Sequence, residues 1–151
     1  MPFQRRKGTF VCSYLSFRDP RLKAAFRLPL VHVKVKHTDV QFRTDALVDS
    51  GATATFLPIE LAEILAIELP ETRQDVVGAG GVFSTFPAQI DLIEVFKGDR
   101  SFCALENANV LIPTQAGAIP HTVLGRDNLF WLHDITFREH RQHTIFREPK
   151  Q

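Results

Sequence analysis

Residues 46–53, which read Ala-Leu-Val-Asp-Ser-Gly-Ala-Thr, constrain the fold of this chain more than any other stretch. An apolar run leads directly into Asp49, and Ser50 and Gly51 follow at once. We expect a buried strand that ends on the carboxylate, because Gly51 allows a turn that a side chain would obstruct and the Ser50 hydroxyl can hold the loop by hydrogen bonding. A carboxylate at the rim of a core is shielded on one side while water still reaches it, which suits acid–base chemistry.

Length and composition indicate a single ordinary globular domain. The chain has 151 residues, of which 44% are apolar and 23% charged. No apolar run approaches the ~20 residues that span a bilayer, so we expect no membrane partner. The basic start is not followed by a continuous apolar region, so we expect no signal peptide. Cys12 and Cys103 are too few for a disulfide framework and favour a reducing compartment, with the cytoplasm as the default.

The positive charge is concentrated at the N-terminus. Residues 1–27 hold seven Lys or Arg residues against Asp19 alone, a net charge of +6 in a chain whose total is +1. We therefore divide the chain into a basic N-terminal extension, residues 1–27, with room for one strand, and a main domain, residues 28–151. The extension could bind nucleic acid or an acidic partner. A solvated flank, or pairing with the acidic body of the chain, is the more common outcome, and nucleic-acid binding is the less favoured alternative.

Alternation and turn signals predict a mostly β protein with short helices. In residues 30–36, Val31, Val33 and Val35 alternate with polar residues, and a turn at 37–39 leads into a second strand, which predicts a hairpin. Asp19-Pro20 marks a break after a first strand. The full set of predicted strands is 9–17, 30–36, 40–43, 46–48, two strands within 72–96, 101–112, 122–124, and a terminal hairpin between 135 and 146.

Two short helices are predicted. Pro58 is suited to the first turn of a helix over 58–66, in which Leu61, Ile64 and Leu65 would face the core. A second helix of one or two turns is expected from Asp127 to Leu132. Residues 113–120 contain two prolines and a glycine and are expected to form a loop.

Two further motifs follow Asp49 in a fixed order. Residues 77–81, Val-Gly-Ala-Gly-Gly, form a glycine-rich hairpin tip, and residues 123–127, Val-Leu-Gly-Arg-Asp, are a second apolar run that ends in glycine. With residues 46–53, this ordered trio resembles the retropepsins, the single-domain aspartic proteases of retroviruses and their cellular relatives. Each motif alone is weak, but the trio in this order is specific and spans Ala46 to Asp127.

The resemblance implies a fold, an assembly and a set of roles. The implied fold is all-β, a closed barrel with one or two short helices, and the implied assembly is a homodimer that needs no metal or cofactor. Ser50 is implied to reach across the two-fold axis and hold the two active-site loops together. The implied roles are Asp49 as the catalytic residue; Ser50, Gly51, Ala52 and Thr53 as loop support; Val77, Gly78, Ala79, Gly80 and Gly81 as the substrate-binding flap; and Gly125, Arg126 and Asp127 as structural residues.

The chain departs from the retroviral pattern at two points. Retroviral enzymes usually carry an acidic residue four positions after the catalytic aspartate, which pairs with the arginine of the third motif. Here that position is Thr53, so Arg126 needs another partner or has none. The interval from the flap to the third motif is also longer than in compact viral enzymes, so loops around the substrate groove are expected to differ.

The chemistry of this family requires two carboxylates that share one proton. This chain offers one Asp-Ser-Gly, and the other aspartates considered (Asp91, Asp99, Asp127 and Asp134) lack the apolar lead-in and the small-residue turn. The second carboxylate must therefore come from a second copy of the chain. The leading prediction is a homodimeric aspartic endopeptidase that cleaves an extended peptide or protein, with pocket walls at Val48, Val77, Val82 and Ile119.

Other interpretations remain open from the sequence. The main one is an inactive module of the same fold that dimerises or binds peptides; Asp49 would then be only a turn residue and the glycines an ordinary hairpin tip. His133, His140 and His143 lie near Asp134 and Glu139, but the spacing matches no ligand pattern, so three surface histidines are favoured over a metal site. Ser50 lacks a G-x-S-x-G context, and neither cysteine has a base nearby in sequence, which disfavours a serine or thiol nucleophile.

Overall fold

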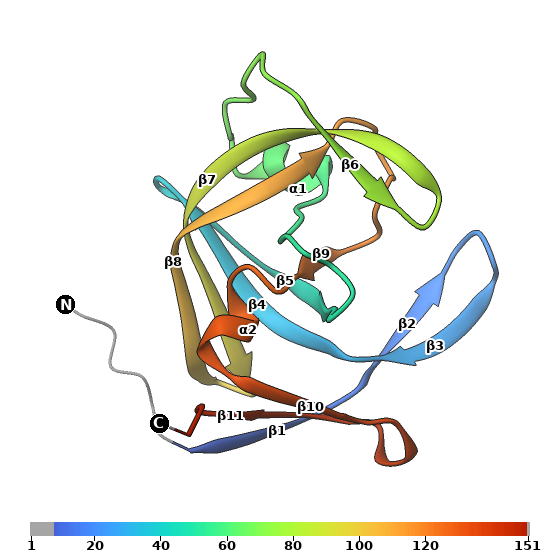
Figure 1. Ribbon diagram of the computed structural model, residues 1–151, viewed down its shortest axis with the longest axis vertical. Coiled ribbons are helices and arrows are strands. Elements are labelled where there is room, and N and C mark those ends of the chain that lie inside the picture. Colours follow the sequence, from blue (N-terminus) through green and yellow to red (C-terminus); the bar gives the residue numbers. More distant parts are fainter. Residues whose placement is uncertain (1–7, 151) are drawn as a thin grey trace.

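The computed structural model describes residues 8–150, which form eleven strands, two short α-helices and one 3-10 turn (Figure 1). The chain is therefore mostly β, as predicted. The strands are β1 (Thr9–Ser13), β2 (Leu15–Asp19), β3 (Ala24–Leu28), β4 (Leu30–His37), β5 (Val40–Val48), β6 (Gln74–Gly78), β7 (Gly81–Lys97), β8 (Arg100–Pro113), β9 (Thr122–Leu124), β10 (Asp134–Arg138) and β11 (His143–Arg147). The helices are α1 (Ile59–Ile64) and α2 (Leu129–Leu132), and the 3-10 turn is η1 (Glu139–Arg141).

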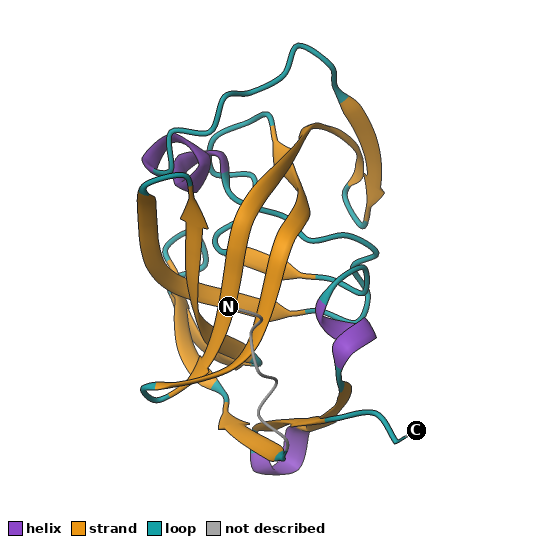
Figure 2. Ribbon diagram, turned by 90° about the vertical axis from the view of Figure 1, so that its left-hand side faces the viewer, coloured by secondary structure: helices purple, strands orange, loops and turns teal. Residues whose placement is uncertain are grey.

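The main sheet has the strand order β6-β7-β4-β5-β9, and β8 pairs with β7. β4 and β5 form the predicted antiparallel hairpin, with His37 opposite Val40 at its turn. Val31, Val33 and Val35 are buried, as their alternation with polar residues predicted, because successive side chains of a strand point to opposite faces. Figure 2 shows the long strands of this sheet curving along the length of the molecule. The core lies against the valine face of the hairpin.

The ladders of the main sheet do not close into a barrel within residues 8–150, so the expected closed barrel is not formed by strands. The gap lies between β8 and β9, and one extended segment bridges it. Phe56 N–H donates to the carbonyl of Val123 at 2.9 Å, and Leu57 N–H donates to the carbonyl of Leu111 at 3.1 Å. The segment is too short to be a strand because the chain enters α1 immediately afterwards.

A second, three-stranded sheet, in the order β1-β11-β10, joins the two ends of the described chain. The predicted terminal hairpin is confirmed as β10 and β11. The prediction that His133 lies on the surface is wrong, because its side chain is only 6% exposed. Its ring meets Phe102 and Phe146 edge-on, with centroids 6.1 and 6.2 Å apart. His133 is therefore part of an aromatic cluster under this sheet.

The predicted strand over 9–17 is in fact two strands, and β3 was not predicted. Tyr14 divides β1 from β2; it is buried, and its hydroxyl donates to Glu139 Oε1 at 2.6 Å. β2 and β3 form a separate hairpin that extends to the right in Figure 1. Its turn is held by Asp19, whose Oδ1 accepts the backbone N–H of Arg21 at 2.8 Å. Residues 1–7 of the basic extension lie outside the described residues, and the division at residue 27 stays a prediction.

Both predicted helices are present, but one of their predicted contacts is wrong. In α1, Leu61 is buried and so is Leu65 just after it, whereas Ile64 is 49% exposed. The helix has only six residues, so its buried face is narrower than the sequence pattern suggested. No helix between residues 8 and 150 is both long and apolar enough to cross a bilayer.

We predict that Phe146→Ala destabilises the protein by about 3–5 kcal/mol, because Phe146 is fully buried and its removal leaves a cavity. Phe26→Ala, at an exposed position of β3, is the matched control and is expected to change stability by less than about 0.5 kcal/mol. Chemical denaturation measures both. Equal losses for the two variants would contradict the position assigned to the core.

Candidate active site

Asp49 lies at the point where β5 and β9 end together, next to the core. β5 and β9 run parallel, with Val48 opposite Leu124. The backbone N–H of Asp49 continues this ladder by donating to the carbonyl of Leu124 at 3.1 Å. Val48 and Leu124 are buried, whereas Asp49 is half-buried. The strand pair thus fixes the backbone of Asp49 while its carboxylate remains within reach of solvent.

The turn after Asp49 is organised around its own carboxylate. The N–H of Gly51 donates to Asp49 Oδ1 at 2.8 Å, and the N–H of Ala52 donates to the Asp49 carbonyl at 3.2 Å. A methyl group at Gly51 would lie 3.2 Å from Oδ1, a tight contact that a shift of a few tenths of an ångström would have to relieve. Ser50 and Thr53 are exposed, and within residues 8–150 the Ser50 hydroxyl makes no hydrogen bond. Ser50 does not lock this loop from inside its own chain.

Gly125 allows the loop after Asp49 to pass directly over the end of β9. A methyl group at this position would overlap the carbonyl oxygen of Ala54 and approach that of Ala52 to 2.9 Å. The N–H of Arg126 donates to the same Ala52 carbonyl at 2.9 Å. Since both obstacles are backbone atoms, no side chain can be accommodated. The third motif therefore clamps the active-site loop.

A polar cluster around the buried Thr55 strengthens this clamp. The Thr55 hydroxyl donates to Asp127 Oδ1 at 2.9 Å, and the Thr55 N–H donates to Asp127 Oδ2 at 3.3 Å. The same hydroxyl oxygen accepts the side-chain amide of Asn128 at 3.2 Å. Asp127 was predicted as a structural residue from the third motif, whereas Thr55 and Asn128 were not predicted. A lone threonine in a small-residue loop carries no signal of its own, because its role depends on contacts with residues about 70 positions away.

Arg126 is exposed and has no acidic partner within residues 8–150. Position 53, where the retroviral pattern has an acid, carries the threonine hydroxyl instead. An open cavity of about 470 Å³ lies between these two residues, with Asp127, Phe130 and Trp131 as the rest of its lining. The third motif therefore holds the loop through the backbone of Arg126 and the side chain of Asp127. The Arg126 guanidinium takes no part in holding the loop.

The glycine-rich segment forms the tip of the β6–β7 hairpin, which lies above the loop that follows β5 in Figure 1. Val77 pairs with Val82 and Gly78 with Gly81, which leaves Ala79 and Gly80 as a two-residue turn. Gly81 has a φ of +111°, a conformation that favours glycine. This arrangement is that of a flap-like hairpin with an exposed tip.

An aromatic contact joins the base of this tip to the active-site loop. Phe83, on β7, lies with its ring centroid 6.0 Å from that of Phe56. A methyl group at Gly78 would lie 3.1 Å from the Phe83 ring, so the glycine gives the ring room to pack under the hairpin. The hairpin is therefore in contact with the segment that directly follows the Asp49 loop.

The four residues predicted as pocket walls lie in three different places in the structure. Val48 is buried beneath the site, so its prediction as a pocket wall is wrong. Val77 and Val82 are 81% and 69% exposed, as a cross-strand pair at the hairpin tip. Ile119 lines a cavity of about 340 Å³ beside α1. There Glu60 Oε1 accepts the N–H of Gly117 at 2.6 Å, which attaches the 113–120 loop to the helix.

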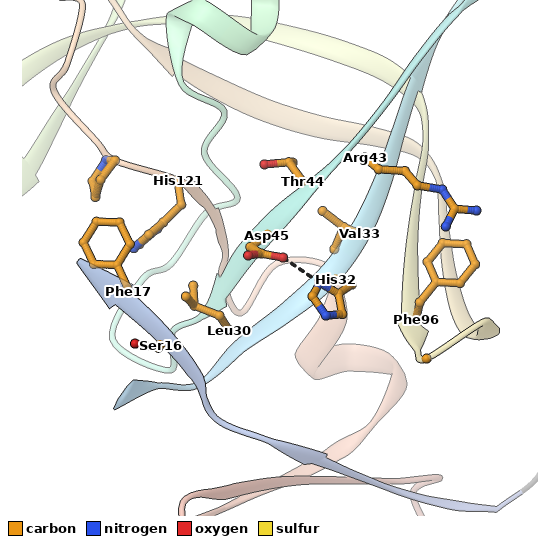
Figure 3. Close-up of a pocket in the computed structure, with 12 residues that line it drawn as sticks. Ser16, Phe17, Leu30, His32, Val33, Arg43, Thr44, Asp45, Phe96 and His121 are labelled. Atoms are coloured by element: carbon orange, nitrogen blue, oxygen red, sulfur yellow. Dashed lines mark hydrogen bonds and ion pairs between the residues drawn. The ribbon is translucent and has the colours of Figure 1, made fainter. Parts of the chain in front are cut away.

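A larger cavity of about 550 Å³ contains none of the residues assigned from the sequence (Figure 3). Across its floor, His32 Nδ1 lies 2.6 Å from Asp45 Oδ1. Phe17, from the β2–β3 hairpin, meets the ring of His121 edge-on with centroids 5.3 Å apart. Burial lowers the pKa of His121. This cavity lies on the polar face of the β4–β5 hairpin, where the alternation indicated only a solvated surface.

The described residues contain no cluster that could hold a metal ion, counted as three His, Cys, Asp or Glu side chains. The site is thus built from one carboxylate, a tight turn, a backbone clamp and a hairpin with an apolar tip. Asp49, its supporting loop and the third motif are in contact with one another. The hairpin is linked to them through Phe83 and Phe56.

Comparison with known proteins agrees with this geometry. The family model described as aspartyl protease matches residues 31–127, which is more than half of the chain. The chain belongs to the retropepsin-like aspartyl protease family. All three motifs, from Ala46 to Asp127, lie within the matched range.

The fold agrees with the family assignment. The crystal structure of a retropepsin-like aspartic protease from Rickettsia conorii matches with a TM-score of 0.59 and 15% sequence identity, over 97% of this chain and 95% of that chain. At this identity the match shows a shared retropepsin-like fold. No curated protein matches the chain by sequence.

We predict that Gly125→Ala destabilises this retropepsin-like protein by about 3 kcal/mol or more, because the added methyl group would overlap backbone that cannot move without displacing the Asp49 loop. Gly80→Ala is the matched control, since nothing lies within 4 Å of the position its methyl group would take. Thermal unfolding followed by circular dichroism compares the two. A Gly125→Ala variant as stable as Gly80→Ala would show that the clamp is not tight.

Proposed function

We propose that this protein is a homodimeric aspartic endopeptidase, which hydrolyses peptide bonds with a water activated by Asp49 and the Asp49 of a second copy. The observation that carries the proposal is the position of Asp49, half-buried at the end of the β5–β9 pair on a loop held by its own turn and by Gly125. Family membership indicates peptidase chemistry. A single Asp-Ser-Gly in the sequence supports the dimer.

The reaction follows from two carboxyl groups held side by side. Like charges about 3 Å apart cannot both ionise, so the pair shares one proton. The ionised member takes a proton from the bound water as the water oxygen attacks the scissile carbonyl carbon. The protonated member donates a hydrogen bond to the carbonyl oxygen, and a proton then passes to the leaving amine. The chain needs no cofactor for these steps.

The surroundings of Asp49 support this use. Gly51 leaves one side of the carboxylate without a side chain, so a substrate backbone can approach it. The Ser50 hydroxyl is exposed and makes no hydrogen bond within residues 8–150, so it is available to the loop of the second copy. Thr53 is also exposed next to this loop. These features are those expected of a loop that faces its own symmetry mate.

The hairpin tip is proposed to close over an extended substrate. Strand-like peptides satisfy their backbone groups by pairing with an exposed edge, and pockets read alternate side chains. Val77 and Val82 offer an exposed apolar pair at the tip. The contact between Phe83 and Phe56 links the hairpin to the segment that follows the Asp49 loop. The flap comprises Val77, Gly78, Ala79, Gly80 and Gly81, and its motion would admit and enclose the peptide.

One observation favours the alternative of an inactive dimerisation or peptide-binding module. Arg126 lacks an acidic partner within residues 8–150, unlike the retroviral pattern. The Thr55–Asp127 cluster holds the same part of the loop by other means, so we favour the enzyme. A cytoplasmic location, suggested by the two cysteines, and nucleic-acid binding by the N-terminal extension both stay predictions.

We predict that Asp49→Asn lowers peptide cleavage by at least about 10⁴-fold, because it removes both the general base and the general acid of the dyad. The amide oxygen of Asn can still accept the Gly51 N–H, so the fold and the dimer are expected to persist. Cleavage of a peptide library across acidic to neutral pH, with sedimentation of both proteins, measures the two properties.

Asp91→Asn is the matched control for this experiment. Asp91 is exposed on β7, where its carboxylate accepts the N–H of Thr38 at 2.9 Å, away from the active-site loop. Its replacement is expected to leave cleavage unchanged. Wild-type activity retained by purified Asp49→Asn would eliminate the enzyme proposal as stated. A folded wild-type dimer that cleaves no peptide would favour the inactive module.

A further inference from the structure

We propose that Trp131 anchors the dimer, by inserting into the cavity beside Arg126 of a second copy of this chain. This inference rests on the proposed function, because it names the surface through which the two Asp49 loops would be brought together. The surface consists of the residues that line this cavity, and we call it the α2 surface: Thr53, Arg126, Asp127, Phe130 and Trp131. The occupant is a second copy, since the site has only one carboxylate without it.

Trp131 is an unusual residue to leave in water. It is the only tryptophan in the chain, and its side chain is 78% exposed. Its neighbour Leu129 on the same short helix is fully buried, so α2 packs against the core by one face and presents the indole on another. Tryptophan is enriched at the centres of protein interfaces and is among the residues whose truncation costs most binding energy.

Backbone contacts connect Trp131 to the catalytic loop. Ala52 donates to the Asp49 carbonyl and accepts the N–H of Arg126. Arg126 and Thr53 then line the cavity that Trp131 borders. The α2 surface therefore begins one residue away from the turn that holds Asp49.

This proximity favours a position for the α2 surface inside a dimer that pairs the two carboxylates. A two-fold axis must pass close to Asp49 if its carboxylate is to meet its own copy. A standard interface buries about 800 Å² on each partner, which for a round patch means a radius of about 16 Å around the axis. A surface that adjoins the Asp49 turn and faces the axis falls within such a patch, and water would be displaced from it on association.

The α2 surface also has the complementary features that a two-fold interface needs. It combines an exposed indole with an open cavity of about 470 Å³ that the same indole borders, and in a symmetric pair the indole of each copy can enter the cavity of the other. Arg126 has no acidic partner within residues 8–150, so its guanidinium is available to lie over the partner's indole ring. Phe130 adds an apolar wall.

The single tryptophan makes this proposal directly measurable. Its emission reports on position 131 alone, without a label. As the wild-type protein is concentrated through the monomer–dimer transition, followed in parallel by sedimentation, we expect the emission to shift to shorter wavelength and acrylamide quenching to fall. Both changes should follow the dimer fraction, because the indole leaves water on association.

The variants test the energetic part of the proposal. Trp131→Ala is expected to raise the dimer dissociation constant by at least about 30-fold, the range of an interface anchor. Its far-ultraviolet circular dichroism and melting temperature should remain those of the wild type, since an exposed side chain contributes little to folding. Leu22→Ala is the matched control: Leu22 is 66% exposed in the turn of the β2–β3 hairpin and is expected to leave the constant unchanged.

The outcomes separate this inference from the function on which it rests. A dimer that forms with no change in emission, and with equal affinity for wild type and Trp131→Ala, would overturn the inference and leave the protease proposal intact. An emission change that follows added peptide substrate at constant dimer fraction would instead place Trp131 in substrate binding and also overturn it. A wild-type protein that stays monomeric at every concentration would remove both proposals.

Discussion

The close passage of the 49–55 loop over Gly125 is the constraint on which the site depends. Two backbone segments meet where no side chain fits, and the carbonyl oxygens of Ala52 and Ala54 occupy the space of a methyl group. This contact lets Arg126 bind the loop by its backbone and lets Thr55 reach Asp127. The carboxylate of Asp49 is therefore carried by a loop that is clamped by contacts within its own chain.

The same loop connects the other parts of the molecule. After the clamp it runs through Phe56, which bridges β9 and β8 across the open part of the sheet. The ring of Phe56 then packs against Phe83 beneath the glycine-rich hairpin. The chain thus uses one short segment to bridge the sheet, contact the glycine-rich hairpin and hold Asp49. The positions of the Asp49 carboxylate and of the hairpin are therefore linked through this segment.

The sequence indicated the fold where a physical pattern was strong. The valines of β4 marked its buried face, and the ordered trio of motifs identified the family that the comparisons show. It was less informative where tertiary contacts decide. Tyr14 interrupts an otherwise continuous strand pattern by bonding to Glu139, and His133 is buried by aromatic rings that come from distant strands. Thr55 and Trp131 carry no local signal, because their roles depend on neighbours 70 residues away or on a second copy.

In the proposed enzyme, two chains each supply one acid to a single site. Wild-type and Asp49→Asn chains, unfolded and refolded together at a fixed total concentration, test it most directly, since the asparagine is nearly isosteric and the two kinds of chain should pair at random. If each active site needs Asp49 from both chains, cleavage falls with the square of the wild-type fraction, to about one quarter in an equal mixture. Activity that stays proportional to the wild-type fraction, about one half in that mixture, would mean that each chain acts alone. This result would contradict an active site shared by two chains.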